Sequence, residues 1–266
     1  MSGVETVLAK AKAEGRAALV GYLPVGFPDL QGSIDAMLAM VEAGVDIVEI
    51  GVPYTDPLMD GPVIAHAADV ALHGGTRFKD VFTAVRAVAD AGAPGLVMTY
   101  WNPVLRYGVD RFAQDLAKAG GAGLITPDLI PDEGAEWIAA AERNDLDHIF
   151  LVAPSSTPQR LRSTTLACSG FVYAASSMGV TGARGTVGDA AEVLVTRTRL
   201  MTDLPICVGL GVSTGAQAAQ VGAFADGVIV GSALVRCLSD ASSGAAGLAA
   251  IGSLSAELAV GVRRGR

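Results

Sequence analysis

Short apolar runs alternate along the chain with longer segments in which apolar side chains recur at helical spacing. The run Asp46–Gly51 has the length of a buried strand. The segment before it places Ile34, Met37 and Val41 at the 3.6-residue period of a packed helix. The predicted strands are Ala18–Leu23, Asp46–Gly51, Gly95–Thr99, Gly123–Thr126, His148–Val152, Phe171–Ala174, Pro205–Gly209 and Gly227–Val230. The predicted helices that alternate with them are Gln31–Ala43, Arg77–Ala91, Val109–Ala119, Asp132–Arg143, Pro158–Ala167, Asp189–Thr198, Thr214–Val221 and Ser232–Leu238.

Three further helices are expected outside this alternation. The amino-terminal segment Met1–Arg16 has the pattern of a short amphipathic helix and lacks the apolar core of a signal peptide. An extra helix, Val63–Leu72, follows the second strand. The segment Ser243–Val262 is rich in Ala, Gly and Ser and carries leucines at helical spacing, so we expect a closing helix packed on the core rather than a membrane span.

Eight strand–helix units in succession favour a parallel sheet. Eight is also the number that closes a (β/α)8 barrel, or TIM barrel, and 266 residues is an ordinary length for one. No linker interrupts the alternation, so residues 1–266 are predicted to form a single TIM-barrel domain of the α/β class. An open, doubly wound sheet is the alternative; against it, the first strand–helix turn, Leu23–Pro28, lacks a GxGxxG fingerprint.

Composition narrows the partners and the compartment. A hydrophobic content of 51% is ample for a packed core, and a net charge of −8 provides no broad basic surface for nucleic acid. The 3 cysteines are widely spaced and form neither a disulfide framework nor a CxxC motif, which favours a reducing, cytoplasmic location. We therefore expect no nucleic-acid partner and no membrane.

Two carboxylates stand out at the second predicted strand and the loop after it. Side chains in a strand alternate faces, so Glu49 shares a face with Ile47 at the carboxyl end of its strand, where barrel enzymes place active residues. An inward carboxylate on an apolar strand is costly unless it has a role. Asp60 follows in a proline-rich loop, and two carboxylates in different settings can hold different pKa values and serve as acid and base. The alternative is that Glu49 caps a strand at the surface and Asp60 starts a turn.

The last three strand–helix loops are rich in glycine. They are Ser176–Gly185, Gly209–Ser213 and Gly231–Ala233, the last leading directly into a helix. Glycine lets a backbone N–H approach an anion, and a helix amino terminus adds unpaired donors. Because barrels commonly bind phosphate after strands seven and eight, these loops predict a phosphate site, with plain turns as the alternative.

Residue types that are missing from the strand ends narrow the chemistry. No lysine lies there to form a Schiff base, no histidine cluster offers three metal ligands, and no cysteine is placed as a nucleophile. Proton transfer by carboxylates remains. The residues concerned are Lys10, Lys12, Lys79, Lys118, His66, His73, His148 and Cys207.

The segment Glu49–Pro62, EIGVPYTDPLMDGP, resembles the signature of the tryptophan synthase alpha subunit family. The Tyr100–Pro103 turn, the Asp128 loop and the three glycine segments resemble that family in order and spacing, and the match runs from Tyr22 to the last helix. The resemblance implies a lyase of tryptophan biosynthesis, which cleaves indole-3-glycerol phosphate by a retro-aldol reaction to indole and glyceraldehyde 3-phosphate.

The resemblance also implies roles for individual residues. Glu49 matches the general acid/base that protonates indole C3, and Asp60 matches the carboxylate that holds the indole N–H as positive charge develops there. The positions that match phosphate-binding residues are Gly182, Gly211, Gly231 and Ser232. Tyr173 and Thr181 match residues that support the carboxylates and the closing loop. The positions that match the wall around the indole are Tyr22, Met98, Ile125 and Leu210.

Relatives of this kind work in an alpha2beta2 complex, so the resemblance implies a beta subunit partner that carries pyridoxal phosphate, with no cofactor in this chain. The matching contact surface comprises loops near 52–60, 100–108 and 128–133. The chain departs from many relatives at Met59, where they have alanine, and at Ser177-Met178, where some carry arginine. Two other functions stay open: an isomerase or epimerase acting on a sugar phosphate, and a regulatory subunit whose barrel only activates a partner.

Overall fold

The strands form one parallel sheet that closes on itself. The computed structural model describes residues 2–175, 189–209 and 211–264. The sheet order is β5-β4-β3-β2-β1-β9-β8-β7-β6, and every pair is parallel. The strands are β1 Ala18–Pro24, β2 Ile47–Gly51, β3 Gly95–Met98, β4 Gly123–Ile125, β5 Asp147–Ile149, β6 Leu151–Val152, β7 Val172–Ala175, β8 Ile206–Gly209 and β9 Gly227–Val230.

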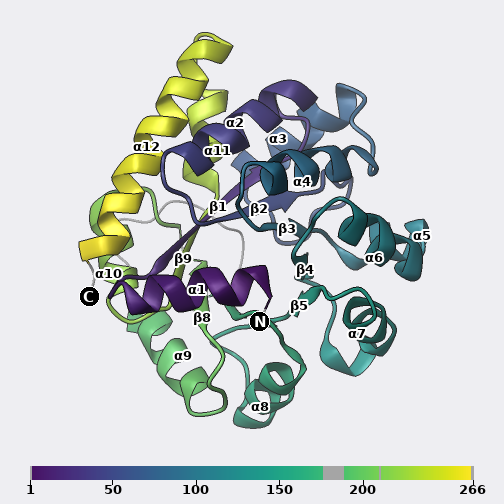
Figure 1. Cartoon of the computed structure of the whole chain (residues 1–266), viewed down its shortest axis with the longest axis vertical. Coiled ribbons are helices and arrows are strands. Elements are labelled where there is room, and N and C mark those ends of the chain that lie inside the picture. Colours follow the sequence, from purple (N-terminus) through teal and green to yellow (C-terminus); the bar gives the residue numbers. More distant parts are fainter. Residues whose placement is uncertain (1, 176–188, 210, 265–266) are drawn as a thin grey trace.

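The two ends of this sheet, β5 and β6, are separated in the chain by Phe150 alone. The predicted fifth strand is therefore present as two short pieces, one pairing with β4 and the other with β7. This joins the ends of the sheet and confirms the (β/α)8 barrel over the open-sheet alternative, as the ring of strands inside the helices in Figure 1 shows.

Helices surround the barrel (Figure 1) and agree closely with the predicted segments. They are α1 Gly3–Ala13, α2 Leu30–Glu42, α3 Pro62–His73, α4 Asp80–Asp90, α5 Trp101–Tyr107, α6 Val109–Lys118, the 3-10 helix η1 Pro131–Glu133, α7 Ala135–Glu142, α8 Pro158–Ala167, α9 Asp189–Arg199, α10 Gly215–Gly222, α11 Ser232–Ser239 and α12 Gly244–Arg264.

The Tyr100–Pro103 segment, expected as a turn, instead opens helix α5. Tyr100 is the N-cap in an extended conformation, and Pro103 falls in the first turn. A proline is tolerated there because the first N–H groups of a helix have no partner inside it. The turn interpretation was wrong for this reason.

Alternation along the strands separates two cores. Ile47, Leu96 and Ile125 lie in the barrel interior, which also receives Val4 and Leu8 from α1. Figure 1 shows α1 lying across the ring of strands, so this helix covers one opening of the barrel. Side chains on the outer face of each strand pack in the larger core between the sheet and the helices; examples are Leu19, Val48, Ile50, Val97 and Val208.

Helix α12 closes the chain. Among the helices of the described residues, α12 has the length and apolar composition that would suffice to cross a membrane. In the fold, 39% of its most apolar stretch is buried. Its side chains Ile251, Leu258 and Val262 are buried in the outer core, and it packs against α2, α10 and α11. This is the packing expected of a core helix.

Candidate active site

Glu49 lies at the carboxyl end of β2 and points into the barrel. It follows Ile47 on the inner face, beside Tyr22 of β1 and Leu96 of β3 in the sheet register. The residue is 1% exposed, and its Oε2 has no hydrogen-bond partner within the part of the chain that the structure describes. Burial raises the pKa of Glu49 to about 8. Burial therefore favours the protonated, neutral form of this carboxyl group over the charged form.

Two tyrosines share this end of the barrel, and each depends on a glycine of a neighbouring strand. A Cβ on Gly51 would lie 2.3 Å from the Tyr22 hydroxyl, and one on Gly209 would lie 2.5 Å from the Tyr173 hydroxyl. Without a Cβ on these glycines, the Tyr22 ring fits over Gly51 and the Tyr173 ring over Gly209. Burial, and in each case the charge of Glu49, raises the pKa of Tyr22 and of Tyr173 well above the usual value.

Asp60 is held by Tyr100, which along the sequence stands out only as part of the Tyr100–Pro103 segment. The Tyr100 hydroxyl donates to Asp60 Oδ1 at 3.2 Å and accepts the Met59 N–H at 2.9 Å. Burial raises the pKa of Asp60, and the Tyr100 hydrogen bond lowers it. After burial, the charges of Asp60 and Glu49 are the next causes that raise the pKa of Tyr22, the residue that lies beside Glu49 in the sheet register.

The loops after β2, β3 and β4 are bonded to one another through α5. The Trp101 N–H donates to both oxygens of Asp128, at 2.9 and 3.1 Å, and the Asn102 amide donates to the Tyr54 hydroxyl at 3.1 Å. The rings of Tyr54 and Tyr100 lie 5.3 Å apart. These contacts join the Asp60 loop to the surface around α5.

Three of the residues expected to bind phosphate are described: Gly231 and Ser232 at the start of α11, and Gly211 after β8. Gly231 is the N-cap of α11, and the buried Ser232 is its first residue, so the N–H groups there have no partner within the helix. A Cβ on Gly231 would approach the Tyr22 ring to 3.4 Å. Gly211 adopts a φ of 32°, in the left-handed region that favours glycine. Such a helix start suits an anion.

The structure describes two of the remaining predicted site residues, and three others lie outside the described residues. Ile125 is buried in the barrel interior, and Met98 packs against that interior core. Thr181, Gly182 and Leu210 lie outside the described residues. The lysines lie on α1, before α4 and in α6, away from the strand ends.

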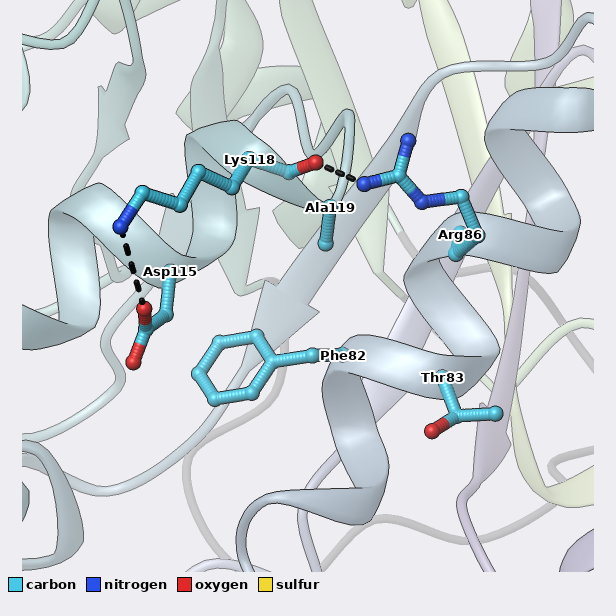
Figure 2. A pocket seen from close by; sticks show the side chains of 6 residues that line it. All are labelled: Phe82, Thr83, Arg86, Asp115, Lys118 and Ala119. Carbon is cyan, nitrogen blue, oxygen red and sulfur yellow. Dashed lines mark hydrogen bonds and ion pairs between the residues drawn. The ribbon is translucent and has the colours of Figure 1, made fainter.

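A pocket of about 430 Å³ lies outside the barrel, between α4 and α6 (Figure 2). Within it, Arg86 donates to the Lys118 carbonyl, and the Lys118 ammonium lies 3.9 Å from Asp115. It is lined by Phe82, Thr83, Arg86, Asp115, Lys118 and Ala119. None of these residues belongs to the carboxylate region, so the pocket is separate from it.

The closed sheet, the buried, inward-pointing Glu49 and Asp60 in the loop after the same strand are features of a (β/α)8-barrel enzyme with two carboxyl groups at its mouth. The family model described as "Tryptophan synthase alpha chain" matches residues 8–259. The chain belongs to this family. It is a lyase of tryptophan biosynthesis that cleaves indole-3-glycerol phosphate to indole and glyceraldehyde 3-phosphate, as the resemblance implied.

Relatives at high identity support the assignment. The chain is 60% identical to the tryptophan synthase alpha chain of Mycolicibacterium paratuberculosis over 99% of its own length and 95% of the relative's. It is 62% identical to that of Salinispora arenicola, over 99% of this chain and 98% of the relative. A chain in a structure of Mycobacterium tuberculosis tryptophan synthase superposes with a TM-score of 0.93 at 58% identity, covering 98% of both chains.

Proposed function

We propose that Glu49 is the general acid and base of the cleavage. The observation that carries this assignment is a buried carboxyl group at the barrel mouth whose pKa is raised to about 8. The protonated carboxyl donates its proton to indole C3. The resulting carboxylate then accepts the proton of the side-chain hydroxyl, the carbon–carbon bond breaks, and its electrons return to the ring. The hydroxyl-bearing carbon becomes the aldehyde of glyceraldehyde 3-phosphate, and Glu49 is protonated again.

Asp60 is the group that holds the indole N–H. Protonation at C3 places positive charge on the ring nitrogen, and a fixed carboxylate there stabilises that charge. Asp60 must be ionised for this role. The hydrogen bond from Tyr100 supports the ionised form against the effect of burial.

The other predicted residues bind the phosphate and the indole ring of the substrate. Gly211, Gly231 and Ser232 bind the phosphate through backbone donors, together with Gly182 on the basis of the resemblance. The indole lies against Tyr22, Met98 and Ile125, and Tyr173 supports Glu49. Thr181 and Leu210 are assigned to loop closure and to the indole wall by resemblance alone.

The chain works as one domain spanning residues 1–266, in the cytoplasm, bound to a tryptophan synthase beta subunit in an alpha2beta2 complex. No cofactor is assigned to this chain; pyridoxal phosphate belongs to the partner. Three exposed apolar side chains support a contact surface on the segments near 52–60, 100–108 and 128–133, the second of which forms helix α5 rather than the loop expected from the sequence: Leu58 is 82% exposed, Leu105 53% and Ile130 40%.

The test is release of indole from indole-3-glycerol phosphate by the chain with its beta subunit. Glu49→Gln is expected to lower kcat by at least about 10²-fold, the usual contribution of a general acid or base. Asp60→Asn is expected to lower it substantially but less completely. Both variants should keep their affinity for glyceraldehyde 3-phosphate, because the phosphate site is untouched.

A matched control is Glu142→Gln, which makes the same chemical change at an exposed position on α7. It should leave kcat unchanged. Turnover by Glu49→Gln equal to that of Glu142→Gln would exclude Glu49 as the acid and favour a barrel that only activates its partner. An isomerase or epimerase would instead leave the carbon–carbon bond intact and release no indole.

A further inference from the structure

We propose that Tyr100 is a positioning residue for the lyase reaction: its hydroxyl fixes one oxygen of Asp60 and keeps that carboxylate ionised toward the substrate. This inference rests on the role proposed above for Asp60. Tyr100 itself need not touch the indole, because its hydroxyl acts through Asp60.

The direction of the two hydrogen bonds follows from the donors available. The Met59 N–H can only donate, so the Tyr100 oxygen accepts it at 2.9 Å. The single hydroxyl proton is then left for Asp60 Oδ1, at 3.2 Å. A hydrogen bond donated to a carboxylate is stronger for the ionised form than for the protonated one. The same hydroxyl also ties down the backbone next to Asp60.

Tyr100 is itself rigid enough to hold this position. It is 5% exposed, and its ring packs against that of Tyr54 at 5.3 Å. The next residue, Trp101, has its N–H fixed by Asp128. Burial raises the pKa of Tyr100 to about 12, so its hydroxyl keeps its proton throughout the working pH range.

The other charged and titratable groups around this bond also bear on its pH dependence. Tyr22 faces Asp60 from β1, and Glu49 of β2 faces Tyr22 in turn. Asp128 faces Tyr100 from the loop after β4. Among the described residues, the tyrosine hydroxyl is the group whose hydrogen bond lowers the pKa of Asp60, against the rise caused by burial.

The experiment is the pH profile of kcat/KM for indole release by Tyr100→Phe, assayed with the beta subunit. Phenylalanine keeps the buried ring and removes only the hydroxyl. We expect kcat to fall by about tenfold or more, as for loss of a hydrogen bond to a charged group. KM should change less, and the acid limb that reports Asp60 should move to higher pH. A smaller folded fraction would lower the profile without moving its midpoint.

Tyr107→Phe is the matched control. Tyr107 is the last residue of α5, the helix that Tyr100 caps, and its hydroxyl donates to the carboxylate of Asp115 at 2.6 Å rather than to Asp60. Because Tyr107 lies in the segment near 100–108 that is proposed to contact the beta subunit, the comparison uses the midpoint of the acid limb and not the level of activity. Removal of the Tyr107 hydroxyl should leave the midpoint of the acid limb in place. A midpoint for Tyr100→Phe equal to that of Tyr107→Phe would overturn the proposal.

A double-variant cycle separates this inference from the role of Asp60. If Tyr100 acts through Asp60, Tyr100→Phe should have little further effect on kcat in an Asp60→Asn background. Equal effects in both backgrounds would show a merely structural role and refute the proposal. Full activity of Asp60→Asn alone would instead remove Asp60 from the mechanism, and the Tyr100 inference with it.

Discussion

The buried carboxyl group of Glu49 makes the stability of the protein depend on pH in a direction that can be measured. Its pKa is 4.5 in an exposed reference state and about 8 in the folded chain, because burial disfavours the charged form. The folded state therefore binds the proton more tightly than the unfolded state. This contribution is fully present below pH 4.5 and is lost as pH rises toward about 8.

The size of the effect follows from the two pKa values. A difference of about 3.5 pH units, at about 1.36 kcal/mol for each, corresponds to about 5 kcal/mol across the window. This is a large share of the ~5–15 kcal/mol by which proteins are ordinarily stable. Glu49→Gln removes the titration and keeps nearly the same shape. Relative to the wild type, the free energy of unfolding of the variant should rise by about 4 kcal/mol between pH 5 and pH 9, because the wild type loses about 1.36 kcal/mol for each pH unit from 5 to about 8.

The measurement is urea unfolding of both proteins at pH 5, 6, 7, 8 and 9, followed by circular dichroism. The difference between the two unfolding free energies isolates Glu49, because every other titrating group is common to both chains. Any fixed cost of the glutamine amide shifts all points equally and leaves the trend unchanged. A difference that stays constant over this range would show that Glu49 has an ordinary pKa in the folded state and would refute the argument.

Two further predictions concern packing and the partner surface. Gly51→Ala should lower kcat/KM by about tenfold and the free energy of unfolding by ~1–3 kcal/mol, because the new Cβ meets the Tyr22 hydroxyl. Gly252→Ala, whose added Cβ has nothing near it, should leave kcat/KM unchanged and leave the free energy of unfolding unchanged or higher. Equal behaviour of these two variants would contradict the packing argument. Leu105→Asp should weaken beta subunit binding, measured by calorimetry, by about tenfold or more without loss of thermal stability, whereas Leu166→Asp on α8 should bind normally. Normal binding by Leu105→Asp would place the interface elsewhere.

The alternation of strands and helices, the barrel and the inward direction of Glu49 were predictable from the sequence. These features follow from the periodicity of apolar side chains, which is a property of residues close together in the sequence. The period of two that sets Ile47 and Glu49 on one face is the same in the sequence and in the folded sheet. The resemblance carried by the Glu49–Pro62 segment also led to the correct family.

Tertiary structure alone decided how these residues act on one another. Tyr100 and Asp60 are 40 positions apart, and their hydrogen bond exists only because the ends of β2 and β3 are adjacent. The fit of Tyr22 over Gly51 depends on the register of two strands. The raised pKa of Glu49 depends on how completely distant segments exclude water from it. Desolvation and side-chain contacts are properties of neighbours in space, so no pattern along the chain could set them.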